Sequence, residues 1–193
     1  MLKKVVTLLA ILVSLLSWPI SYYVDPPSLN LESIVYFDQR DELVHQQKLA
    51  LIFNPAKRIF YNKYSVYLER YTENLFYLVD INNYFFSGHP REDISGLSHR
   101  FKYPYIYLVP LLVGGLVVIS SQSKKRLLMF TLTIVALSIT PVFRNMDGFD
   151  FLMFFPISYL IVKGILAINQ TKYWLVINSV LVLIGIVEIW RIL

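Results

Sequence analysis

Cysteine is absent from this chain of 193 residues, and charged side chains are scarce. The lack of cysteine excludes disulfides and thiolate metal ligands, so thiol usage gives no information on the redox compartment. Charged residues make up 16% of the chain, against about 25% in ordinary soluble domains. Hydrophobic residues reach 56%, and the mean hydropathy is +0.54. This composition is typical of an integral membrane protein.

Apolar residues are concentrated in blocks that approach the length needed to cross a bilayer as a helix. The first block, 5–24, follows Lys3 and Lys4 and lacks a small-residue cleavage site. We interpret it as an uncleaved signal anchor, the alternative being a cleaved signal peptide. The other blocks cover about 104–121, 127–143, 149–168 and 173–190. The sequence therefore predicts an all-α integral membrane protein with about five transmembrane helices.

The positions of the basic residues predict the orientation of these helices. With the N-terminus in the cytoplasm, the inner ends of the blocks carry Lys3, Lys4, Lys124, Lys125, Arg126, Lys163 and Lys172. The short outer ends carry only Arg144 and Arg191. Because cytoplasmic loops are enriched in Lys and Arg, we expect a multi-pass plasma-membrane protein with a cytoplasmic N-terminus and an extracytoplasmic C-terminus. The predicted domains are an anchor (1–24), an extracytoplasmic segment (25–103) and a four-helix transmembrane domain (104–193).

The extracytoplasmic segment reads as amphipathic helices. It carries nine Lys or Arg against ten Asp or Glu. A helix is predicted over 39–53 with Asp38 as its N-cap, and a longer one over 56–86 after the break at Asn54-Pro55. The longer helix is expected to present one apolar face, formed by Ile59, Phe60, Tyr64, Tyr67, Leu68, Tyr71, Leu75, Leu78 and Val79. Its polar side is expected to hold Lys63, Glu69, Arg70, Glu73 and Asn74.

The order of several short motifs is similar to a known family. Phe60-Tyr61-Asn62-Lys63 leads into the Tyr-rich helix that ends at Asn83-Tyr84-Phe85-Phe86, and an aromatic entry, Tyr105-Ile106-Tyr107-Leu108-Val109-Pro110, follows. Further along come Gly114-Gly115, the basic turn Lys124-Lys125-Arg126, and Arg144 before Phe149–Pro156. Over about 30–168 this order resembles the C-terminal portion of GT-C membrane glycosyltransferases, the class with the protein O-mannosyltransferase-like and aminoarabinose-transferase-like enzymes.

The departure from that family affects the functional interpretation. GT-C enzymes carry their catalytic carboxylate in the first outer loop and have many more spans. We expect this chain to lack a counterpart of that N-terminal half, so the resemblance implies a detached or truncated C-terminal half that is not catalytic alone.

Asp41 and Glu42 are the candidate catalytic residues, because they form an acidic pair in the first outer loop of this chain. A carboxylate there could act as a general base or help bind a divalent metal. The structural alternative is an acidic first turn of a helix, which is favourable to the helix dipole.

Arg144, Arg91 and His89 are the candidate lipid-phosphate ligands. A guanidinium contacts phosphate through two parallel hydrogen bonds, and the family resemblance points to Arg144 as well. The alternatives are a polar hairpin turn with Arg144 paired to Asp147 or Asp150, and an exposed loop for His89.

Metals, cofactors and nucleic acid are not expected. His45, His89 and His99 show no metal-ligand spacing, and the basic residues flank apolar blocks and form no continuous patch. Lys163 is an ionisable residue inside an apolar block, where snorkelling to the inner boundary is the simplest interpretation. Gly114 and Gly115 are expected to allow close helix approach.

Three functions remain open at this point. The first is an accessory or partner-binding subunit that works with a lipid-linked sugar or with a larger membrane glycosyltransferase. The second is an active glycosyltransferase that uses a polyprenyl-phosphate sugar, alone or as a split enzyme. The third is a transporter or channel component, which is disfavoured because the apolar blocks hold few polar residues to form a path.

Overall fold

The structure is a computed structural model that describes residues 1–24, 26, 32–36, 39–52, 62–85, 102–120, 124–143 and 151–193. These residues form helices together with one isolated β-bridge, between Ser33 and Phe143. The predicted all-α fold is therefore confirmed for the described part of the chain. The N-cap predicted at Asp38 and the break at Asn54-Pro55 lie outside the described residues.

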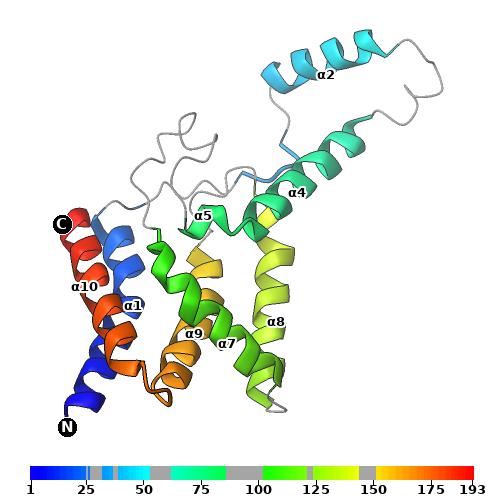
Figure 1. Ribbon diagram of the computed structural model, residues 1–193. Coiled ribbons are helices and arrows are strands. Elements are labelled where there is room, and N and C mark those ends of the chain that lie inside the picture. Colours follow the sequence, from blue (N-terminus) through cyan, green and yellow to red (C-terminus); the bar gives the residue numbers. More distant parts are fainter. Residues whose placement is uncertain are drawn as a thin grey trace.

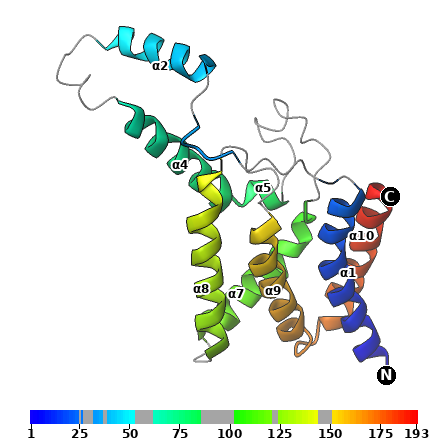
Figure 2. The same ribbon diagram turned by 180° about the vertical axis from the view of Figure 1, so that it is seen from behind.

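Apolar helices build an upright bundle (Figure 1). They are α1 (Leu2–Val24), α7 (Leu108–Ser120), α8 (Lys124–Ile139), α9 (Phe151–Ile168) and α10 (Trp174–Ile192). The chain ascends in α1, α8 and α10 and descends in α7 and α9, as Figures 1 and 2 both show. We call the end that holds the N-terminus and the turn before α10 the lower end. The C-terminus lies at the upper end.

Two of these helices, α1 and α10, have the length and composition needed to cross a membrane. The apolar helical segments Tyr105–Ser120, Thr133–Val142 and Leu152–Ile168 are shorter. Because α1 lies at the N-terminus, its length and hydropathy also fit a signal sequence. The structure thus indicates membrane association, and the five-span topology stays a prediction.

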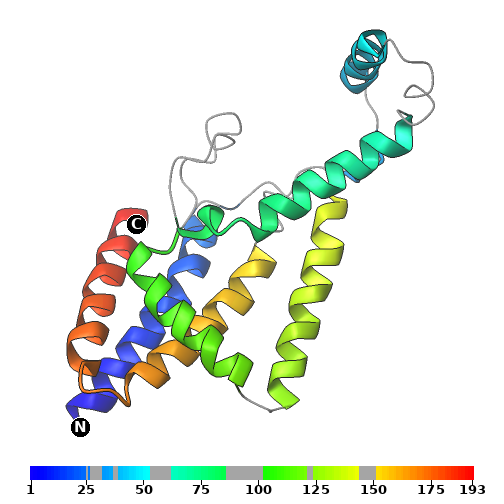
Figure 3. The ribbon, with the colours of Figure 1, turned by 45° about the vertical axis from the view of Figure 1, so that its right-hand side comes forward.

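Helices α2 (Gln39–Leu51) and α4 (Lys63–Val79) form an arm above the upper end, followed by the short α5 (Asn82–Phe85). In Figure 3, α4 begins at the outer end of the arm, beside α2, and ends near the top of α8. The short helices η2 (Tyr105–Tyr107) and η3 (Thr140–Val142) continue α7 and α8 at the upper end. The arm is thereby attached to the bundle at the top of α8.

The single helix predicted over 56–86 is wrong for its described part, because α4 begins only after Asn62 and ends at Val79. Asn62 caps α4: its Oδ1 accepts hydrogen bonds from the backbone N–H groups of Tyr64 (3.0 Å) and Ser65 (3.1 Å). Asp80 then adopts an extended conformation and accepts from the Asn82 N–H at 3.0 Å. Short polar side chains that bond to nearby backbone groups compete with helix continuation, so the helix ends there.

The predicted apolar face of α4 is also wrong in part. Leu78 is fully buried, but Tyr64 and Leu68 are 79% and 65% exposed. The face that packs on the bundle includes Asn74, which is 8% exposed and was expected on the polar side. Backbone carbonyls at the top of α8 need donors, and this requirement outweighs hydrophobicity at that position. The apolar residues of α4 that stay uncovered are Tyr64, Leu68, Phe76 and Val79, which we call the free stripe.

Glycine sets the close contact between α7 and α9. A Cβ atom on Gly114 would lie 1.8 Å from the Leu160 carbonyl oxygen, and one on Gly164 would lie 1.7 Å from the Pro110 carbonyl oxygen. Gly115 meets nothing within 4 Å. The expected close approach is therefore confirmed for Gly114 and not for Gly115.

Helices α1 and α10 pack side by side in parallel (Figure 1). The Lys3 ammonium lies 5.3 Å from the centroid of the Trp174 ring, and further up the pair Val13 faces Gly185. Small residues line the buried side of α1, namely Thr7, Ala10, Ser14, Ser17 and Ser21. Small side chains allow apolar helices to approach closely, so this seam of α1 suits its packing on both α10 and α9.

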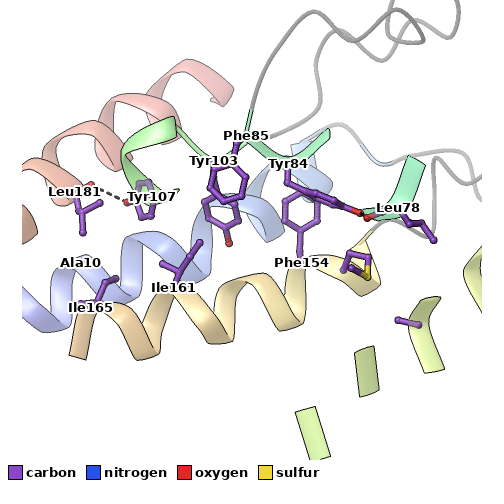
Figure 4. Packing of buried hydrophobic residues seen from close by; sticks show 12 residues of the cluster. Ala10, Leu78, Tyr84, Phe85, Tyr103, Tyr107, Phe154, Ile161, Ile165 and Leu181 are labelled. Atoms are coloured by element: carbon purple, nitrogen blue, oxygen red, sulfur yellow. Dashed lines mark hydrogen bonds between the residues drawn. The ribbon is translucent and has the colours of Figure 1, made fainter. Parts of the chain in front are cut away.

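An aromatic cluster joins the arm to the bundle below α5 (Figure 4). The Tyr103 ring lies 5.7 Å from Phe85 and 5.9 Å from Phe154, centroid to centroid. Its hydroxyl lies 3.1 Å from the Ser14 carbonyl oxygen and 2.8 Å from Ser158 Oγ. Burial raises the pKa of the Tyr103 phenol, so this hydroxyl stays protonated and can donate. Tyr107 donates to the Leu181 carbonyl oxygen at 2.9 Å and links η2 to α10.

Candidate functional site

The two predicted catalytic residues lie in the first turn of α2 and differ in surroundings. The Asp41 side chain is 15% exposed and faces α4, whereas Glu42 is exposed. The proposed lipid-phosphate ligands Arg144, Arg91 and His89, and the alternative partners Asp147 and Asp150, lie outside the described residues. The described part of the candidate site is therefore the junction between α2, α4 and residues 32–36.

Arg70 of α4 holds this junction together. Its Nη2 lies 2.5 Å from Asp41 Oδ1, and its Nη1 donates to the carbonyl oxygens of Ile34 (2.9 Å) and Tyr36 (3.1 Å). The Arg70 side chain is 19% exposed, so solvent screens these contacts only in part. One guanidinium thus ties three segments together, as its planar set of donors allows. The sequence pattern had assigned Arg70 only to the polar side of its helix.

A second ion pair joins the same two helices further along. Lys48 Nζ lies 3.3 Å from Glu69 Oε1, with side-chain exposures of 47% and 43%. Exposed pairs of this kind contribute about 0–1 kcal/mol. Asp41 and Arg70 therefore hold α2 on α4 more firmly than Lys48 and Glu69 do.

A cleft of about 150 Å³ opens between α2 and α4. It is lined by Val44, Val66 and the ionisable side chains of Asp41, His45, Lys48, Glu69, Arg70 and Glu73. Both acidic and basic groups line it, and the Asp41 carboxylate is bonded to Arg70. No group of three or more His, Cys, Asp or Glu able to hold a metal ion occurs in the part of the chain that the structure describes. This geometry gives Asp41 a structural role, and its catalytic role stays a prediction.

The underside of the junction satisfies the carbonyls at the top of α8. Asn74 Nδ2 donates to the carbonyl oxygens of Pro141 (3.1 Å) and Phe143 (2.9 Å). The backbone N–H of Ile34 donates to the Val142 carbonyl oxygen at 2.9 Å. The last carbonyls of a helix have no partner within it, so Asn74 acts as a side-chain cap supplied by another helix. The sequence pattern did not predict this role. The available signal was that Asn74 follows Arg70 by four residues, which places both side chains on the same face of α4.

Asn74→Ala tests this cap. We expect the free energy of unfolding to fall by about 2 kcal/mol, because two nearly buried carbonyls lose their donor. Asn74→Asp is the matched variant: it keeps the shape but replaces the donor with an acceptor, and we expect an equal or larger loss. Denaturant titration of the purified protein in detergent, followed by circular dichroism, measures both. Unchanged stability in both variants would contradict the cap.

Lys102 interacts with Asp80 at the base of the arm. Burial lowers the pKa of Lys102, and the nearby Asp80 carboxylate opposes part of that effect. Asp80 also organises the turn after α4 by accepting from the Asn82 side chain at 2.7 Å. The base of the arm is thus a polar junction with charges of both signs.

Comparison with known proteins adds no relative. No protein-family model matches this chain, and neither the curated proteins nor the solved structures include a match. The fold therefore defines only a broad class, that of α-helical membrane-associated proteins, here with a helical arm at one end.

Proposed function

We propose that the chain is a five-span membrane protein with a cytoplasmic N-terminus, and that its arm is a docking element for a larger membrane glycosyltransferase. In this proposal the upper end is extracytoplasmic and the protein is an accessory subunit without catalysis of its own. The role in lipid-linked sugar transfer rests on the sequence resemblance to the C-terminal portion of GT-C enzymes.

The observation that carries the accessory role is the state of the arm. Its best candidate for catalysis, Asp41, is bonded to Arg70 and holds the arm together. Its free stripe leaves large side chains uncovered, with Phe76 70% and Leu68 65% exposed. An arm in which α4 has an uncovered apolar stripe and the Asp41 carboxylate of α2 is held in an ion pair is suited to binding a partner.

The separation of charge supports the proposed orientation. Lys3, Lys4 and Lys172 lie at the lower end, where α8 also begins with Lys124-Lys125-Arg126. The acidic residues that the structure describes belong to residues 32–80 and to Glu188 near the C-terminus, and so to the upper end. A basic lower end on the cytoplasmic side agrees with the distribution seen in multi-span proteins.

Affinity purification from native membranes tests the proposal. We expect the tagged full chain, extracted in a mild detergent, to carry a stoichiometric multispanning partner or a bound polyprenyl phosphate in native mass spectrometry. With the double variant Leu68→Lys and Phe76→Lys, the amount of co-purified partner should fall at least about tenfold, because the variant places two charges on the free stripe.

The matched control is Glu69→Gln, which lies on the α2 side of α4 and leaves the free stripe intact. Substitutions at exposed positions such as 68, 69 and 76 change the free energy of unfolding by about 0.5 kcal/mol or less. Loss of the partner in the double variant would therefore not reflect unfolding. Recovery of the wild-type chain alone, with bulk phospholipid only, would reject glycosyl transfer as the setting of this protein.

A further inference from the structure

Helix α9 has an outer side that the bundle leaves partly uncovered. Phe154, Ile161 and Ile165 are at most 2% exposed on its buried side. On the opposite side, Phe155 and Leu166 are 54% and 44% exposed. Tyr159 and Lys163 lie between them at helical spacing and are half-buried. Figure 2 shows α9 between α8 and α1.

Lys163 is a cation on this otherwise apolar side. Its ammonium lies 5.5 Å from the centroid of the Tyr159 ring, one turn further up the helix. It forms no ion pair with any residue that the structure describes. An ammonium placed in an apolar layer requires an anion, and the face of a tyrosine ring satisfies that requirement only in part.

The structure places Lys163 on Tyr159 and not at the lower boundary of α9. The residue precedes the lower end of α9, Ile168, by five positions, which is about 7.5 Å along the helix. The Cα–Cβ bond of a helical residue tilts toward the helix N-terminus, which for α9 is the upper end. The contact with Tyr159 follows that direction, and the flexible four-carbon stem of lysine can also turn the ammonium down to a phosphate at the lower boundary.

The lower end offers no acidic partner among the residues that the structure describes. Lys3 and Lys172 are exposed there, with their ammonium groups 5.3 Å and 5.0 Å from the centroids of Trp174 and Tyr173. Every described acidic residue belongs to the upper end. A counter-charge for Lys163 from outside the chain, at the depth of the inner leaflet, fits this arrangement.

We propose that the side of α9 formed by Phe155, Tyr159, Lys163 and Leu166 binds one anionic phospholipid of the inner leaflet. The phosphate contacts the Lys163 ammonium, and an acyl chain lies along Tyr159 and Phe155. This proposal rests on the five-span topology with a cytoplasmic N-terminus. Charge complementarity selects a lipid phosphate, because basic sites beside helices at the cytoplasmic surface are suited to anionic headgroups.

A single reporter can test the site, since the chain has no cysteine of its own. Leu166→Cys, one turn from Lys163, carries a bimane label in full-length protein reconstituted in phosphatidylcholine vesicles. Nitroxide-labelled phosphatidylglycerol and nitroxide-labelled phosphatidylcholine then compete to quench it. We expect about fivefold preference for phosphatidylglycerol, equivalent to about 1 kcal/mol for one basic residue at an anionic surface.

Three variants in the Leu166→Cys background assign the preference to Lys163. Lys163→Met should reduce the ratio of quenching by phosphatidylglycerol to quenching by phosphatidylcholine to about one, whereas Lys163→Arg should keep the fivefold preference. Lys172→Met removes a nearby exposed charge at the same end and should also keep it. Equal quenching by both lipids in labelled Leu166→Cys with Lys163 in place, or a preference that survives Lys163→Met, would overturn the lipid site.

Two other outcomes identify a different occupant or a different topology. A label that neither lipid nor aqueous iodide quenches would mean that protein covers this side of α9, for instance a partner helix with a carboxylate, and would reject the lipid. Quenching by iodide alone would place Leu166 in water. That result would reject the membrane topology of the proposed function, and the lipid site with it.

Discussion

Replacing Gly114 with alanine should lower the free energy of unfolding by about 3 kcal/mol, the upper part of the range for overpacking. The new Cβ atom would lie 1.8 Å from the Leu160 carbonyl oxygen and 2.8 Å from its carbonyl carbon. These are backbone atoms of α9, so no side-chain rotation relieves the clash and the two helices must separate. Gly164→Ala should have the same effect from the other helix, because its Cβ atom would meet the Pro110 carbonyl oxygen.

The neighbouring residue supplies the matched control for this prediction. Gly115 is in the same helix, and a Cβ atom added to it would have no other atom within 4 Å. Gly115→Ala should therefore be neutral, or stabilising by up to about 1 kcal/mol through helix propensity. Unfolding by denaturing detergent, followed by circular dichroism, compares the three variants. Equal stability of Gly114→Ala and Gly115→Ala would show that α7 and α9 do not meet at this contact.

Arg70→Met should release α2 from α4 without unfolding the bundle. The change removes an ion pair and two hydrogen bonds to carbonyls, while methionine keeps most of the aliphatic stem. Hydrogen bonds that involve a charged group contribute about 1.5–3 kcal/mol. We expect the free energy of local opening to fall by about 2 kcal/mol, which is about a thirtyfold rise in the open population.

Hydrogen exchange of the α2 amides measures this release. Amides of α2 should exchange about thirtyfold faster in Arg70→Met, while those of α9 stay as in the wild type. Glu69→Gln breaks only the exposed pair with Lys48 and should change α2 exchange by less than about threefold. Wild-type exchange of α2 in Arg70→Met would show that other contacts hold the arm.

The sequence predicted the helices of the bundle well because long apolar runs have few alternatives. The blocks at 104–121 and 149–168 coincide with α7 and α9, and the first block coincides with α1. The helix predicted over 39–53 likewise corresponds to α2. Length and hydrophobicity alone determine such helices, so no knowledge of tertiary contacts was needed.

The arm was harder to predict because short polar side chains determine it. Asn62 starts α4 and Asp80 ends it through local hydrogen bonds, and periodicity carries no signal for either. Asn74 and Arg70 face inward because carbonyls from distant segments need donors there. These partners are far apart in sequence, so hydropathy assigned both residues to the polar side. The candidate site was predicted at Asp41, but its partner Arg70 was not.

The parallel pairing of α1 with α10 has a consequence for biosynthesis. With the proposed topology, α1 enters the bilayer long before the ribosome has made α10, and it must wait there without its partner. Thr7 donates to the Lys3 carbonyl oxygen at 2.8 Å and Ser14 to that of Ile11 at 2.8 Å. These hydroxyls are satisfied by the backbone of α1 itself. The helix can therefore reside in lipid without unsatisfied hydroxyls at these two positions until α10 is synthesised and packs against it.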